Sequence, residues 1–234
     1  MLNFRVDATL LQPHVPSGTE LNFFDGQALL SVVGFRFLNT RVHGVAIPFH
    51  RDFEEVNLRT YVRREDHGEV RHGVTFIREL VPRRAIAMIA RAIYNEPYVA
   101  VPMTSDVQLQ AGRVRSAAYG WRTAVGDCEL KAGVTAQESS LPSYGSEECF
   151  VTEHYWGYTR QRDGRTIEYE VLHPQWNVYP ATSAHLRGNS ALLLGPGFAD
   201  VLKEQPCSAW VADGSEVTVF SPRRLDDGRS RTTY

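Results

Sequence analysis

The stretch that decides the fold is EVNLRTYV at residues 55–62. Side chains of a β-strand alternate between two faces, so the two halves of this pattern point in opposite directions. One face carries Val56, Leu58, Thr60 and Val62, and the other carries Glu55, Asn57, Arg59 and Tyr61. This second set, the polar row, is either a solvated sheet face or the wall of a polar pocket. The pattern alone favours a solvated face, because most half-polar strands face water.

Strand patterns with turn signals continue on both sides of this segment. His67-Gly68 predicts a hairpin that joins residues 56–64 to residues 69–80. Asp-Gly pairs at 25–26, 163–164 and 213–214 carry the same hairpin signature. Residues 27–37 form a long apolar run, typical of a central strand buried on both faces. Further strands are expected at 107–110, 113–121, 129–135, 166–172 and 216–220. The expected fold class is mainly β, antiparallel, with minor α.

Helices are expected at three places. Pro82 is tolerated in a first turn, and apolar residues from Ile86 to Ile93 follow helical spacing until Pro97 forces an end. Ser146 is a suitable N-cap for a short helix that begins with two glutamates. A further short helix is expected at residues 198–203.

Composition bounds the class of protein. With 234 residues and 43% hydrophobic content, residues 1–234 are expected to form one domain. The net charge of -2 and a pI near 6.4 argue against a nucleic-acid partner. No apolar run reaches the ~20 residues of a membrane span. Three widely spaced cysteines, Cys128, Cys149 and Cys207, fit a reducing cytoplasm better than a disulfide framework. Residues 1–6, MLNFRV, read as a strand already under way, which leaves open whether native N-terminal residues precede them.

Lysine is scarce in this chain. Only Lys131 and Lys203 are lysines among 25 basic residues. Codon bias in a GC-rich genome is the simplest explanation, but the chemical consequence holds in either case. Arginine stays protonated and suits carboxylate recognition, whereas lysine is the residue that forms Schiff bases. Few positions could therefore support imine chemistry.

Other candidate site residues lie near the polar row. Arg78 and Glu79 end the next strand, beside the entrance to the helix. A buried ion pair of either residue with the row would be a binding feature or a costly structural one. Glu96 lies between the phenols of Tyr94 and Tyr98, which is either ordinary helix-exit chemistry or a carboxyl group placed for acid–base work. Nucleotide loops, zinc motifs and Gly-x-Ser-x-Gly are missing from the sequence, so we expect no metal and no cofactor.

Several motifs together carry a resemblance to a known family. They are VGF at 33–35, PFHRDFEEVNLRTYV at 48–62, GVTF at 73–76, NEPY at 95–98, TEHYWG at 152–157 and HPQW at 173–176. With them the chain resembles the YqjF-like family of uncharacterised bacterial proteins, in the acetoacetate-decarboxylase-like superfamily. The resemblance implies a closed, cone-like antiparallel β-barrel with flanking strands, a few helices and an interior pocket. It also makes the polar row a pocket wall.

The resemblance has a consequence for mechanism at the turn that contains Pro97. In the decarboxylases, a lysine just after a Tyr-Pro or Phe-Pro turn forms the Schiff base, aided by a second lysine, glutamates and an arginine. The nearest match here is residues 96–99, EPYV, where Tyr98 and Val99 stand in the places of the two lysines. A phenol cannot form an imine with a ketone, so acetoacetate-type decarboxylation is not expected.

Three functions remain open at this point. The first is binding of a small carboxylate or oxo acid by Arg59, with Asn57, Tyr61, Arg78 and Tyr98 as further ligand contacts. The second is a lysine-independent lyase, isomerase or hydrolase, with Glu55 or Glu96 as general base and Arg59 stabilising negative charge. The third is a structural or homo-oligomeric module whose polar row is a satisfied core network.

Overall fold

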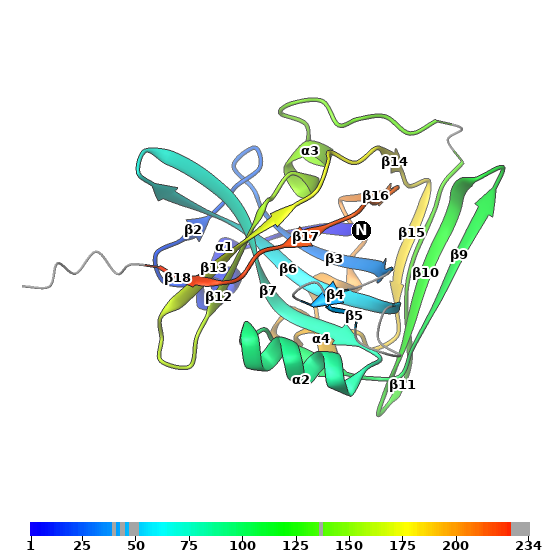
Figure 1. The fold of residues 1–234 in the computed structure, drawn as a ribbon. Coiled ribbons are helices and arrows are strands. Elements are labelled where there is room, and N and C mark those ends of the chain that lie inside the picture. Colours follow the sequence, from blue (N-terminus) through cyan, green and yellow to red (C-terminus); the bar gives the residue numbers. More distant parts are fainter. Residues whose placement is uncertain (39–40, 43–44, 47–51, 136–137, 226–234) are drawn as a thin grey trace, which may run out of the picture.

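The computed structural model describes residues 1–38, 41–42, 45–46, 52–135 and 138–225, with side chains left undescribed at 41–46. The described chain is mainly β (Figure 1). The strands are β1 (Leu2–Val6), β2 (Glu20–Leu21), β3 (Ala28–Phe37), β4 (Arg41–Val42), β5 (Val45–Ala46), β6 (Phe53–Asp66), β7 (Glu69–Val81), β8 (Tyr98–Ala100), β9 (Met103–Gln110), β10 (Arg113–Thr123), β11 (Gly126–Gly133), β12 (Trp156–Arg160), β13 (Thr166–Leu172), β14 (Val178–Pro180), β15 (Ser183–Arg187), β16 (Ser208–Ala212), β17 (Thr218–Val219) and β18 (Arg223–Arg224). The helices are α1 (Ala8–Leu11), α2 (Arg84–Ile93), α3 (Glu147–Thr152) and α4 (Ala191–Leu194), with 3-10 turns η1 (Gln12–His14), η2 (Pro196–Phe198) and η3 (Val201–Lys203). None of these helices combines the length and apolar character needed to cross a membrane.

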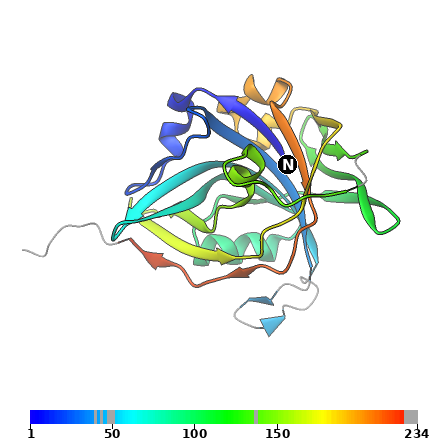
Figure 2. The same ribbon diagram turned by 90° about the horizontal axis from the view of Figure 1, so that it is seen from above.

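Most strands belong to one large sheet, whose order is β14-β16-β1-β3-β6-β7-β12-β13-β17. A smaller sheet has the order β15-β11-β10-β9. Figure 2 shows the strands of the large sheet following a curve. The pairings within the described part of the chain leave this sheet with two ends, so the predicted closed barrel is not confirmed.

The central hairpin was predicted correctly. β6 and β7 pair antiparallel over most of their length, and His67 and Gly68 turn between them with φ angles of 52° and 83°. Both angles are in the left-handed region that a two-residue hairpin turn requires. The Asp163-Gly164 turn likewise joins the paired strands β12 and β13.

The hairpin predicted at Asp213-Gly214 does not form. β16 pairs with β1 and β14, whereas β17 pairs with β13, so the two strands that flank this turn diverge. A local turn signal does not specify the partner of a strand, and here both neighbours of β16 come from distant segments. The predicted strand at 216–220 is reduced to Thr218–Val219.

The helix predictions were partly correct. α2 begins at Arg84, shortly after Pro82, and ends at Ile93. α3 follows Ser146, whose hydroxyl oxygen accepts a hydrogen bond from the Cys149 backbone at 3.2 Å. The predicted helix at 198–203 was wrong, because η2 and η3 close only i to i+3 hydrogen bonds there, the tighter form that short helical segments often take.

The two faces of the β3-β6-β7 region have different coverings. The apolar face carries Val56, Leu58 and Val62, all fully buried in the main core together with residues of β10 and β11. The opposite face, called the polar face below, carries the polar row. Near Phe53 it packs with residues of α2, and near Tyr61 it packs with Val151 of α3. The row is therefore enclosed at both ends.

A buried carboxyl cluster on the polar face

The polar row is not a solvated sheet face. Glu55 and Asn57 are 1% exposed and Tyr61 is fully buried, while Arg59 is partly buried. The pattern-based preference for a solvated face was wrong, because the helices and strands that cover the polar face are not visible in the alternation of one strand. Burying such groups is costly unless they find partners or change protonation state.

A β-bulge decides which charged residue of β7 joins the row. The register shifts between Leu58 and Arg59, so Arg59 lies opposite Phe76 but Leu58 lies opposite Arg78. Ile77 is the extra residue, and it reverses the alternation of the rest of β7. Glu79 is consequently opposite Asn57, on the polar face.

Arg78, a candidate ligand contact in the sequence, therefore lies on the opposite face of the sheet from the row. Arg78 shares its side of the sheet with Leu58. An ion pair with the row is missing as well, since none of the salt bridges between described residues involves Arg78, Glu79 or the row.

Three glutamates form the centre of the site: Glu55, Glu79 and Glu96, called the carboxyl cluster below. They are 1%, 2% and 4% exposed. Glu55 accepts hydrogen bonds from the Asn57 amide at 3.0 Å and from the Tyr98 hydroxyl at 2.9 Å. Tyr98 reaches it because β8 runs parallel to β7, with Tyr98 beside Glu79. The turn after α2 thus brings both Glu96 and Tyr98 to the polar face.

Glu96 has partners on β12 and β13, the strands that follow β7 in the large sheet. Its Oε1 accepts hydrogen bonds from the Thr159 hydroxyl at 2.6 Å and the Tyr169 hydroxyl at 2.7 Å. Gly157 makes room for Tyr169, because a Cβ at Gly157 would lie 2.1 Å from the phenol ring. Neither Thr159 nor Tyr169 was recognised from the sequence, and neither carries a local signal that points to Glu96.

Burial dominates the electrostatics of the cluster. It raises the pKa of Glu55 and of Glu96 from the ordinary value of 4.5 to about 7, against the opposing effect of their hydrogen bonds. The pKa of Glu79 is raised well above that ordinary value by burial and by the neighbouring carboxyl groups of Glu96 and Glu55. At neutral pH the cluster therefore keeps protons that exposed glutamates would have released.

Arg59 and Tyr61 lie further along the row. The Arg59 guanidinium donates a hydrogen bond to the Val151 carbonyl at 2.9 Å, and it lowers the pKa of Glu55 slightly by its charge. The Tyr61 hydroxyl lies 2.7 Å from the Ser31 hydroxyl, which in turn donates to Asn3. Tyr61 thus belongs to a buried network at the other end of the row from Glu55.

Several buried polar atoms on this face have no hydrogen-bond partner among the described residues. They include Asn57 Oδ1 and Arg59 Nε. The Oε2 atoms of Glu79 and Glu96 also lack a separate donor, but these two carboxyl groups share a hydrogen bond when one of them holds a proton. Buried polar atoms are usually paired, so Asn57 Oδ1 and Arg59 Nε indicate a place for a polar ligand or water. Nothing in the described part of the chain gathers three or more histidine, cysteine, aspartate or glutamate side chains in an arrangement that holds a metal ion.

Comparison with solved structures shows the fold. The chain is similar to the enduracididine biosynthesis enzyme MppR complexed with pyruvate, with 15% identity, 97% of this chain and 87% of that chain covered, and a TM-score of 0.65. Acetoacetate decarboxylase from Legionella pneumophila gives 12% identity, 98% and 84% coverage, and a TM-score of 0.62. An acetoacetate decarboxylase-like enzyme from Sphingomonas wittichii RW1 gives 15% identity, 96% and 89% coverage, and a TM-score of 0.59. The fold is thus acetoacetate-decarboxylase-like.

Sequence comparison agrees with the resemblance drawn from the motifs. The uncharacterized protein YqjF of Bacillus subtilis strain 168 is 29% identical over 174 residues, which are 72% of this chain. The chain spans 66% of that relative, just under two thirds of its length. Residues 48–51 of the motif lie outside the described residues. Residues 1–216 match the DUF2071 family of uncharacterized conserved proteins, and the chain belongs to that family.

Proposed function

We propose that the polar face binds a small carboxylate or oxo acid and that Arg59 contacts its carboxylate. One observation carries the proposal: Arg59 is a partly buried guanidinium that makes no ion pair with a described residue and whose Nε has no partner. A desolvated guanidinium without a carboxylate is costly, and a bidentate ligand carboxylate satisfies it. The unpaired Oδ1 of Asn57, the next side chain of the row, would orient the ligand.

The neutral form of the carboxyl cluster supports an acidic ligand. Ionised glutamates would repel a carboxylate, but burial keeps protons on the cluster near pH 7. MppR, which shares the fold, was solved in complex with pyruvate, an oxo acid. The proposal retains the interior pocket of the predicted cone without requiring a closed barrel.

Pyruvate binding tests the proposal directly. Titration of the protein with pyruvate should give saturable shifts in the NMR spectrum, and Arg59→Gln should weaken binding by about tenfold or more, as expected when a charge-assisted hydrogen-bonded pair is lost. Arg91→Gln, a change of an exposed arginine on α2, is the matched control and should bind as the wild type does. Equal affinity of Arg59→Gln and wild type for pyruvate would contradict the role of Arg59.

A second candidate function, lysine-independent proton transfer, is favoured by the pKa values of Glu55 and Glu96 near 7. A carboxylate of that basicity is suited to remove a proton from the carbon beside a carbonyl, with Arg59 stabilising the resulting enolate. Lys131 lies on β11 of the smaller sheet and Lys203 is an exposed residue of η3 paired with Asp200, so neither element contributes to the cluster. Schiff-base chemistry is not part of this proposal.

Hydrogen exchange distinguishes catalysis from binding alone. In D2O the wild-type protein should accelerate exchange of the pyruvate methyl protons, with a rate that rises through pH 7 as Glu55 ionises. Glu55→Gln should abolish the acceleration yet keep pyruvate binding. Binding without any acceleration in the wild type would leave the protein a binding module and remove the enzymatic candidate.

A further inference from the structure

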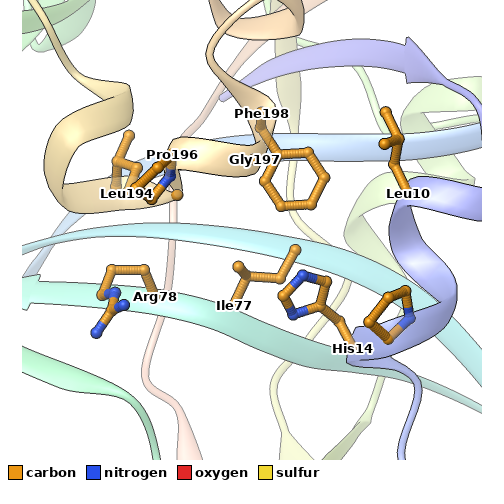
Figure 3. Close-up of a pocket in the computed structure, with 10 residues that line it drawn as sticks. Leu10, His14, Ile77, Arg78, Leu194, Pro196, Gly197 and Phe198 are labelled. Carbon is orange, nitrogen blue, oxygen red and sulfur yellow. The ribbon is translucent and has the colours of Figure 1, made fainter.

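A groove lies on the other side of β7 from the carboxyl cluster. It has a volume of about 330 Å3 and is formed by β7, by the segment from α1 to η1, and by the segment from α4 to η2. Figure 3 shows Arg78 and Ile77 below η2, with Phe198, His14 and Leu10 gathered at the other end. Its size is at the low end of the range found for small-molecule pockets.

The β-bulge places Arg78 here. With Ile77 as the extra residue, Ile77 and Arg78 both line the groove, whereas Glu79 faces the cluster. The Arg78 guanidinium makes no hydrogen bond or ion pair with a described residue, and its Nε is buried without a partner. A guanidinium in that condition favours an anion.

The rest of the lining has no opposing charge. None of the residues around the groove is an aspartate or glutamate. His14 lies with its ring 5.5 Å from that of Phe198, and its pKa is lowered by burial and by the charge of Arg160. Arg78 therefore supplies the charge of the lining, while Leu10, Ile77, Pro196 and Phe198 supply apolar walls.

We infer that this groove is a second binding site, for a small organic anion with an apolar body, such as an aromatic monocarboxylate whose carboxylate contacts Arg78. The ring of the ligand would lie against Ile77 and Phe198, where its burial replaces water at apolar side chains. The inference does not depend on the ligand proposed for the polar face, since the two sites lie on opposite sides of β7 and use different arginines.

Fluorine NMR with para-fluorobenzoate tests this site. The wild type should bind para-fluorobenzoate, and it should bind para-fluorobenzamide, which has the same shape but no charge, about tenfold more weakly or worse. Arg78→Gln should weaken benzoate binding to the level of the amide. Arg91→Gln, which changes an exposed arginine outside both sites, should leave it unchanged.

The alternative outcomes each refute the inference. Equal binding of the acid and the amide would show that no cation recognises the ligand. Loss of benzoate binding in Arg59→Gln but not in Arg78→Gln would assign the ligand to the polar face. If the wild type does not bind para-fluorobenzoate at millimolar concentration, the groove is not a site for this class of anion. The comparison of acid with amide uses only the wild-type protein, so it stands even if Arg78→Gln does not fold.

Discussion

Replacing Glu55 with glutamine should remove a large part of the pH dependence of stability. Burial raises the pKa of folded Glu55 to about 7, whereas the unfolded chain has the ordinary value of 4.5. Between those values the folded protein keeps a proton that the unfolded chain releases. The stabilisation is complete below pH 4.5 and is lost as pH rises towards 7, so the free energy of unfolding of the wild type falls over this window.

The size of the effect follows from the shift in pKa. The difference between about 7 and 4.5, at about 1.4 kcal/mol for each pKa unit, corresponds to about 3 kcal/mol for Glu55 alone. Glutamine stays neutral at every pH, and its carbonyl oxygen still accepts a hydrogen bond from Asn57 or Tyr98. The Glu55→Gln change also removes the Glu55 charge, which helps to raise the pKa of Glu79 and Glu96. The pKa values of these two groups should therefore fall, and this further reduces the loss of stability with rising pH.

Urea unfolding at pH 4.5, 6 and 7.5 measures this prediction. Over that range the free energy of unfolding of Glu55→Gln should fall by about 3 kcal/mol less than that of the wild type, with unchanged denaturant dependence. Glu69→Gln, at the exposed start of β7, is the control and should follow the wild type. If Glu55→Gln loses stability as steeply as the wild type, the Glu55 carboxyl is not protonated in the folded protein and the account of the cluster is refuted.

Three further changes probe the elements that hold the site. Tyr98→Phe removes a hydrogen bond that favours the ionised form of Glu55, so the pKa of Glu55 should rise above about 7 in a carbon-13 NMR titration; a lower pKa would contradict the assigned contact. Gly157→Ala forces a Cβ against the Tyr169 ring and should destabilise the protein by about 1–3 kcal/mol in thermal or urea unfolding, whereas a neutral effect would mean that Tyr169 is not held there. Ser146→Ala removes the cap of α3 and should cost about 1 kcal/mol, while Ser146→Asp should retain most of that stability.

Local patterns in the sequence were sufficient for the central hairpin and the longest helix. The period-two alternation of residues 55–62, the His67-Gly68 turn and the helical spacing after Pro82 each depend on neighbours within a few residues. For that reason β6, the β6-β7 hairpin and α2 were predicted with nearly the observed bounds. Glu55 and Tyr98, which form a hydrogen bond, were also both identified from the sequence as candidate site residues.

Tertiary structure decided the composition of the site. Alternation alone would place Arg78 on the polar face, and one extra residue at Ile77 replaces that cation by Glu79. A bulge depends on how β7 fits β6 and its other neighbours, and no short sequence signal announces it. The protonated carboxyl cluster and the separate groove around Arg78 both result from this single shift in register.

The hydrogen-bond partners of the carboxyl cluster could not be predicted from the sequence either. Glu96 meets Tyr169 across 73 residues of chain, through a sheet order that places β12 beside β7 and β13 beside β12. The sequence by itself therefore determined which strand carries the polar row, the position of α2 and the lack of a lysine after Pro97. Only the packing of distant strands decided that the row is buried and that its neighbours are carboxyl groups, because burial and pairing are properties of the assembled sheet.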